Sequence, residues 1–325
     1  MQKNAYIVAA VLVVVILVGT GAGLYFLNQP SSSTSSSSTM GQATTSAGQM
    51  ATNTTIQIVA AENFWGSLVS QLGGTHVHVV SIVTDPNADP HEYESSSADA
   101  IAIADASYII VNGAGYDTWA LSLIAADNNP NQKVLNVQEL IGQSIGANPH
   151  FWYSPYYVND TVHAMYSDLL SIDPTNAAYY HLQYVALNAS LGVYNERIDE
   201  IRQQFGGTKV ASTESIFVYL ANATGLDLIS PPAFMEAVAE GNDPPAQSVV
   251  QFEQQIDSGN VSVLVYNEQT VTPLTQSIKA LAAQHNVPII GVTETIQPPD
   301  VQFQVWMNGE LLALQNALNA NALGQ

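Results

Sequence analysis

The alternation of short and long apolar segments constrains the fold of this chain more than any other feature. From residue 55 onward, short runs rich in β-branched residues alternate with longer segments of helical period, which is typical of parallel α/β architecture. The runs fall into two groups of four, and we therefore predict two lobes, each a four-stranded, mainly parallel sheet with flanking helices. The predicted strands are residues 55–61, 76–83, 107–112, 133–137, 208–212, 226–230, 261–267 and 287–292.

A long helical segment separates the two groups of strands. In residues 180–205 the apolar side chains recur at alternating spacings of four and three. Asp173 and Pro174 precede the segment as a start signal, and Gly206 and Gly207 follow it as a stop signal. The pattern fits either the seam of a coiled-coil dimer or a spine along both lobes. Because the helix stands alone between two sheet-forming halves, we favour the spine and expect a monomer whose rigid connecting helix limits hinge motion.

The first 27 residues have the composition of a membrane anchor. Residues 5–27 carry no charge and would form a helix of roughly 35 Å, enough for a bilayer core of about 30 Å. The alternative is a cleaved signal peptide, but its apolar region would be shorter and no clear A-x-A cleavage site follows. Lys3 is the only charge before the span, so we expect residues 1–4 to be a cytoplasmic tip. We therefore predict a single-pass protein of the cell membrane with an extracellular C-terminal domain.

The remaining chain divides by composition. Residues 28–54 are rich in Ser and Thr and have few large apolar side chains, which predicts a flexible linker. We assign residues 55–172 to an N-terminal lobe, residues 173–206 to the connecting helix and residues 207–325 to a C-terminal lobe.

Charge and cysteine content exclude several functions. The chain has six Lys or Arg against 27 Asp or Glu, a formal net charge of −21, so a nucleic-acid backbone would be repelled. Cysteine is absent, which excludes disulfides, thiolate metal sites and a lipid-modified N-terminal cysteine. Any metal ion must be held by nitrogen and oxygen.

Four side chains lie just beyond predicted strands, where parallel sheets bind their ligands. His91 and His150 follow strands of the first lobe, and Glu214 and Glu294 follow strands of the second. Taken singly, such residues are more often turn histidines and helix-start glutamates. Taken together, two imidazoles and two carboxylates suit a divalent transition metal bound between the lobes.

Several segments together resemble the metal-binding substrate-binding proteins of zinc and manganese ABC importers, over roughly residues 55–318. They are AENFWGSLVSQLGG, DPNADPHEYE, VNGAGYDTW, NPHFWYSP with DPTNAAYY, STESIFVYLANATGL, VLVYNEQTV and GVTETI. The resemblance implies two metal-binding α/β lobes joined by a rigid helix. It also implies a protein that binds Zn²⁺ or Mn²⁺ as cargo and passes it to an ABC permease in the same membrane, without enzymatic chemistry.

The same resemblance implies the ligand set. The histidines of its two Pro-His turns correspond to His91 and His150. Its third ligand is His in typical zinc members and Glu in manganese members, and Glu214 stands at that position. Its fourth is usually Asp in a TDS sequence, for which this chain has the longer Glu294 in TET. The identity of the metal stays open at this stage.

Other residues and functions remain as alternatives. Glu92 and Glu94 are close enough to His91 to orient it, although solvated charges are the simpler interpretation, and Asn112 and Tyr116 are expected in a loop and the cleft wall. A surface adhesin of the same family and a metallohydrolase are the competing functions, but no HExxH or comparable catalytic cluster is present. We expect metal loading to weaken below about pH 6.5, where protons compete for imidazole.

Overall fold

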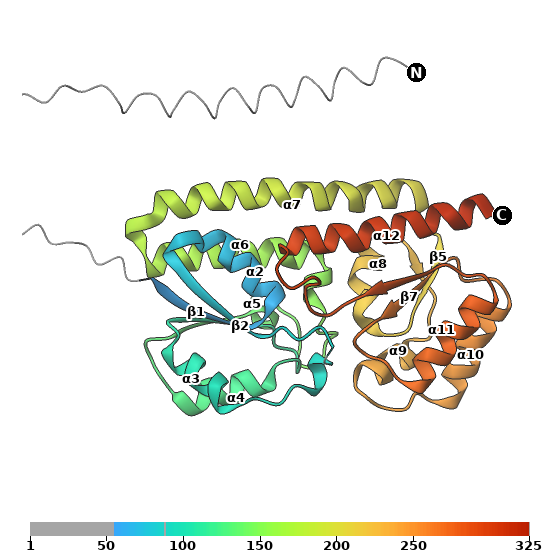
Figure 1. Cartoon of the computed structure of the whole chain (residues 1–325), viewed down its shortest axis with the longest axis horizontal. Coiled ribbons are helices and arrows are strands. Elements are labelled where there is room, and N and C mark those ends of the chain that lie inside the picture. Colours follow the sequence, from blue (N-terminus) through green and yellow to red (C-terminus); the bar gives the residue numbers. More distant parts are fainter. Residues whose placement is uncertain (1–54, 88, 325) are drawn as a thin grey trace, which may run out of the picture. The chain divides into compact units, whose positions relative to one another are not determined.

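The computed structural model describes residues 55–87 and 89–324 (Figure 1). The predicted cytoplasmic tip, membrane span and linker, residues 1–4, 5–27 and 28–54, lie outside the described residues. Within the described ranges, no helix is both long and apolar enough to cross a membrane.

Two parallel sheets with flanking helices form the fold, as predicted. The strands of the first sheet are in the order β2-β1-β3-β4 and those of the second in the order β6-β5-β7-β8, so both sheets have the same topology. The strands are β1 (Ile56–Glu62), β2 (Val77–Val83), β3 (Tyr108–Val111), β4 (Lys133–Asn136), β5 (Lys209–Ser212), β6 (Asp227–Leu228), β7 (Leu264–Asn267) and β8 (Ile289–Val292).

Seven of the eight strands are shorter than the sequence predicts, and β6 and β7 differ most, by three residues each. β6 has only two residues, because Ser230 turns its hydroxyl to the backbone of Ser212 and Pro231 then begins the approach to the next helix. β7 begins at Leu264 rather than at residue 261, although Val263 still accepts a hydrogen bond from Ala211 N. Apolar runs thus locate the strands but overestimate their lengths.

Helices cover both faces of each sheet. The α-helices are α2 (Asn63–Gly73), α3 (Ser97–Asp105), α4 (Thr118–Asp127), α5 (Val137–Leu140), α6 (Pro155–Ile172), α7 (Ala177–Phe205), α8 (Val218–Thr224), α9 (Pro232–Ala239), α10 (Ala246–Asp257), α11 (Pro273–Gln284) and α12 (Phe303–Gly324). Short 3₁₀ turns are η1 (Gly74–His76), η2 (Pro90–Glu92), η3 (Phe151–Tyr153), η4 (Pro174–Asn176) and η5 (Ser215–Phe217).

The connecting helix α7 is close to its prediction. Asp173 stands at its start, accepting hydrogen bonds from Asn176 and Tyr180, and Gly206 follows its last residue. α7 packs against α2 and α6 of the first half and against α8 of the second. α12 lies beside it (Figure 1) and also reaches α2, where Phe303 N donates a hydrogen bond to Ser67 Oγ. α7 therefore connects the lobes, and α12 of the second lobe adds a further contact with the first.

One hydrophobic core runs through both lobes. It lies on the α7 and α12 side of the sheets and includes the buried rings of Phe64, Trp152, Phe217 and Trp306. Two smaller cores lie on the opposite faces, one beneath α3 and α4 and one beneath α10 and α11. Because the shared core would have to be broken to separate the lobes, it holds the two sets of strand ends in a fixed relation.

Candidate metal centre

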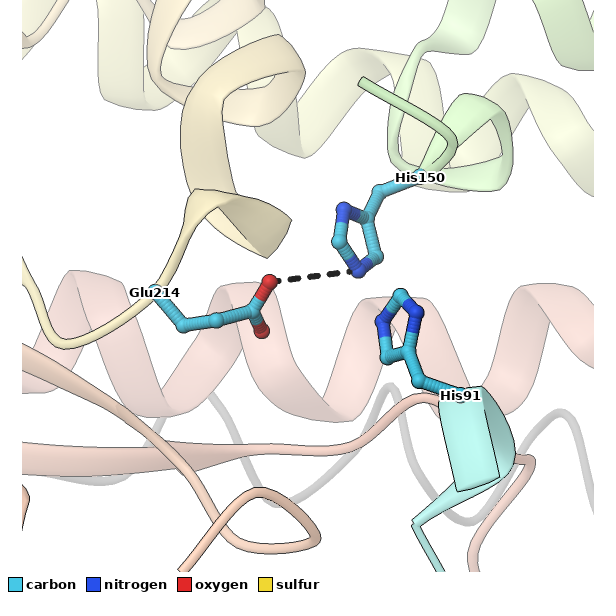
Figure 2. A group of neighbouring side chains, drawn as sticks. All are labelled: His91, His150 and Glu214. Atoms are coloured by element: carbon cyan, nitrogen blue, oxygen red, sulfur yellow. Dashed lines mark ion pairs between the residues drawn. The ribbon is translucent and has the colours of Figure 1, made fainter. Parts of the chain in front are cut away.

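The four predicted side chains come from the carboxyl ends of the strands, and short turns present three of them. His91 lies within η2, while His150 and Glu214 immediately precede η3 and η5. Glu294 follows β8 by two residues. Figure 2 shows His91, His150 and Glu214 pointing toward one another from separate segments.

The structure brings all four side chains into one cluster. His91 Nε2 lies 3.2 Å from Glu294 Oε2. His150 Nε2 lies 3.4 Å from Glu214 Oε1 and 3.7 Å from Glu294 Oε2. His150, Glu214 and Glu294 are fully buried, and His91 is 18% exposed. Two imidazoles of the first lobe thus face two carboxylates of the second.

These separations suit a single ion. Ligand atoms about 2.0–2.1 Å from a tetrahedral metal lie roughly 3.3–3.4 Å from one another. Both Nε2 atoms are buried and form no hydrogen bond within the described structure, although carboxylate oxygens are close. A cation among the four side chains would satisfy both nitrogens and both acids.

The charged groups of the cluster shift one another's pKa values. Burial by itself lowers the pKa of His91, but the carboxylates of Glu294, Glu214 and Asp89 together outweigh it and raise the pKa to about 9. Burial likewise favours a neutral Glu294, yet His91 and His150 hold its pKa well below the usual value, whereas burial raises the pKa of Glu214. Without metal, His91 is therefore protonated at neutral pH. The sequence-based expectation of proton competition near pH 6.5 is too low for His91, because it took no account of Glu294.

Asn148 fixes the orientation and tautomer of His150. Its Oδ1 lies 2.7 Å from His150 Nδ1 and also accepts a hydrogen bond from His150 N at 3.1 Å. Since an amide oxygen only accepts, Nδ1 carries the proton and Nε2 keeps its lone pair for a metal. Asn148 Nδ2 donates to Ser215 O across the lobes, 2.7 Å away.

Residues of both lobes hold the two carboxylates. Asn267 Nδ2 donates to Glu214 Oε2 at 2.6 Å and to Glu294 Oε1 at 2.8 Å. Tyr116, expected in the cleft wall, lines the cavity beside the cluster and also donates its hydroxyl to Glu294 Oε2 at 2.8 Å. Sequence reasoning missed Asn267, whose only signal was its position at the end of a predicted strand.

The three weaker candidates have different positions. Asn112 supports the His150 turn, because its Nδ2 donates to Pro149 O at 2.8 Å and its Oδ1 accepts from Trp65 Nε1. Glu92 and Glu94 are exposed, as the solvated interpretation expects.

An open cavity of about 920 Å³ adjoins the cluster and gives a route to it. Residues of both lobes line it, including His91 and Tyr116 from the first and Ser215 and Asp227 from the second. Its lining includes the acidic side chains of Asp227, Glu236 and Glu240, which attract cations into the cavity.

Comparison with known proteins identifies a matching family. Residues 58–317 match the family described as zinc-uptake complex component A, periplasmic. The manganese-binding lipoprotein MntA of Halalkalibacterium halodurans is 26% identical over 181 residues, covering 54% of this chain and 59% of the relative. The high-affinity zinc uptake system protein ZnuA of Bacillus subtilis is 20% identical over 207 residues, covering 58% and 64%. The matched part thus spans less than two thirds of either relative.

Solved structures share the fold. A crystal structure of ZnuA superposes with a TM-score of 0.66 at 24% identity, and the match covers 82% of this chain and 100% of that one.

Proposed function

The chain belongs to the zinc-uptake complex component A family, and from this membership we propose that it is an extracytoplasmic receptor for a divalent transition metal. The receptor captures zinc or manganese between its lobes and delivers the ion to the permease of an ABC importer. It performs no covalent chemistry, since the ion is cargo.

One observation carries this proposal. Two carboxylates and two imidazoles from opposite lobes converge in a buried cluster, and among the described residues the histidines are the only ion-pair partners of Glu214 and Glu294. Two buried acids are costly without a cation, and a divalent ion would neutralise both. His91, His150, Glu214 and Glu294 are the proposed ligands.

The proposal extends to the cellular arrangement. Residues 5–27 anchor the protein, residues 28–54 tether it, and the two metal-binding lobes, 55–172 and 207–325 with the connecting helix 173–206, work outside the membrane as a monomer. A relative named as a lipoprotein supports attachment to the membrane. Because this chain has no cysteine to carry a lipid, the apolar segment of residues 5–27 attaches the protein to the membrane instead.

Metal analysis tests the function directly. Full-length protein is purified without added metal, analysed for its elements, and titrated with Zn²⁺ and with Mn²⁺ by calorimetry. We expect one ion per chain, and loss of binding in His91→Ala and Glu214→Ala. Glu92→Ala, an exposed neighbour of His91, is the control and should bind normally. Ester or peptide turnover by the loaded protein would favour a metallohydrolase, and partner binding retained by both variants would favour an adhesin.

A further inference from the structure

A fifth potential donor lies beside the four proposed ligands. The ligand atoms of Asp89, His91 and Glu294 all lie within 4.8 Å of one another, as do those of His91, His150 and Glu214. The two groups share His91, and the first adds a carboxylate from the turn that carries this histidine. Asp89 is half-buried, so its charge is only partly solvated.

The two oxygens of Asp89 have different surroundings. Oδ1 accepts a hydrogen bond from His91 N at 2.9 Å and thereby caps η2. Among the described residues, Oδ2 accepts only a long contact of 3.3 Å from Thr270 Oγ1, and the same hydroxyl lies 3.2 Å from Glu294 Oε1. Oδ2 is therefore on the side of the Glu294 carboxylate, with lone-pair capacity left for a cation.

A second observation is that His91, beside Asp89, has a ring nitrogen without a hydrogen-bond partner in the described structure. His91 belongs to both groups, and its Nε2 is buried and forms no hydrogen bond within the described structure. Three acids, Asp89, Glu214 and Glu294, lie close enough to His91 to affect its charge. One divalent ion bound by the two glutamates alone would leave the charge of Asp89 unmatched beside them.

The number of donors bears on which ion fits. Zinc is satisfied by four ligands in a tetrahedron, whereas manganese takes a larger shell and prefers carboxylate oxygen. Two nitrogens and three carboxylates suit a five- or six-coordinate ion better than a tetrahedral one. We propose that Asp89 is a further ligand of the cargo ion and that this fifth donor favours manganese over zinc. This inference rests on the proposed receptor function.

Asp89→Asn tests the role, because asparagine keeps the size of the side chain and its Oδ1 can still cap η2. Mn²⁺ and Zn²⁺ affinities of full-length wild type and variant are compared by competition with a chelator. We expect Mn²⁺ affinity to fall about tenfold or more, and Zn²⁺ affinity to change less than about threefold. An equal loss for both ions would overturn the proposal, because Asp89 would then act only through the position of His91.

Matched variants separate charge from structure. Asp89→Ser also retains a capping oxygen but cannot reach the ion, so it should reproduce the selective loss. Asp85→Asn, in the same segment and exposed, should leave both affinities unchanged. If wild type binds neither ion, the receptor function itself fails. If wild type binds both and Asp89→Asn keeps their ratio, only the role of Asp89 fails.

A spectroscopic measurement of the coordination number gives an independent check. Co²⁺ bound to wild type should show the weak visible absorption of five or six ligands, and Asp89→Asn should gain the more intense bands of a four-coordinate ion. Intense four-coordinate bands in wild type would contradict the fifth ligand.

Discussion

The hydroxyl of Tyr153 lies 2.8 Å from the main-chain oxygen of Thr293, and this contact links the turn that follows His150 to the loop that carries Glu294. The same hydroxyl lies 2.7 Å from Glu310 Oε2 of α12. Burial raises the pKa of Glu310 to about 8, so this carboxyl is mostly protonated at neutral pH. Tyr153 can then donate its single proton to Thr293 O and accept one from Glu310. The three groups fix two ligand-bearing segments relative to each other.

Removing the hydroxyl of Tyr153 should therefore lower both the stability of the fold and the metal affinity of the site. Tyr153→Phe leaves buried polar groups without a partner, a change that typically costs about 1–3 kcal/mol of unfolding free energy. We also expect weaker metal binding, since the loops of His150 and Glu294 lose a shared contact. Urea denaturation and calorimetric titration measure the two effects. Tyr156→Phe is the exposed control, and equal behaviour of both variants would show that the contact has no such role.

The carboxyl of Glu310 should make the protein more stable in mild acid. Its folded-state pKa of about 8 lies above the usual value for glutamate, so the folded state binds the proton more tightly than the unfolded state. Its contribution is fully present below about pH 4.5 and is lost as pH rises toward 8.

The isosteric variant Glu310→Gln isolates this contribution, because glutamine does not titrate. The unfolding free energy of wild type relative to Glu310→Gln should fall by a few kcal/mol, to order of magnitude, between about pH 5 and 8. Urea denaturation across this range measures it. Glu240→Gln, an exposed substitution, is the control, and a constant difference between wild type and Glu310→Gln would exclude the buried proton.

The amide of Asn267 should be required for tight metal binding. It donates to both buried carboxylates, so it sets their spacing and keeps them apart before the ion arrives. We expect Asn267→Ala to reduce metal affinity about 10- to 100-fold, the usual effect of removing a group that orients ligands. Calorimetry compares it with the exposed Asn242→Ala. Undiminished affinity in Asn267→Ala would mean that the carboxylates need no amide to hold them.

The sequence predicts the sheets and the set of four side chains because both follow local rules. Apolar runs mark the strands, and the positions of His91, His150, Glu214 and Glu294 just past strands place them at the ligand-binding edge. The long helix α7 can also be predicted from the sequence, because its apolar side chains keep a helical spacing between the start signal at Asp173 and the stop signal at Gly206.

Contacts between distant segments are harder to predict. The Tyr153 and Thr293 contact joins residues 140 positions apart, and the position of α12 against α2 depends on the packing of both lobes. The strong effect of Glu294 on His91 likewise depends on a 3.2 Å separation across the lobes. Such relations have no local sequence signal, because they arise only when the shared core brings the two halves together.

Metal binding should release a proton from His91. Because the nearby carboxylates, Glu294 above all, overcome the effect of burial and raise the pKa of His91 to about 9, the ring is charged in the metal-free protein at neutral pH and must lose its proton to bind an ion. Apparent affinity should therefore fall as pH decreases below about 9, by about tenfold per pH unit where this one proton dominates.

Calorimetry detects that proton directly. Zn²⁺ titrations of full-length protein at pH 7.5, in two buffers with different ionisation enthalpies, should give different observed enthalpies that correspond to about one proton released per ion. Replacing exposed His78 by Gln should leave this number unchanged, because His78 lies outside the cluster. A buffer-independent enthalpy, together with constant affinity between pH 6 and 8, would show that His91 is already neutral before the metal binds.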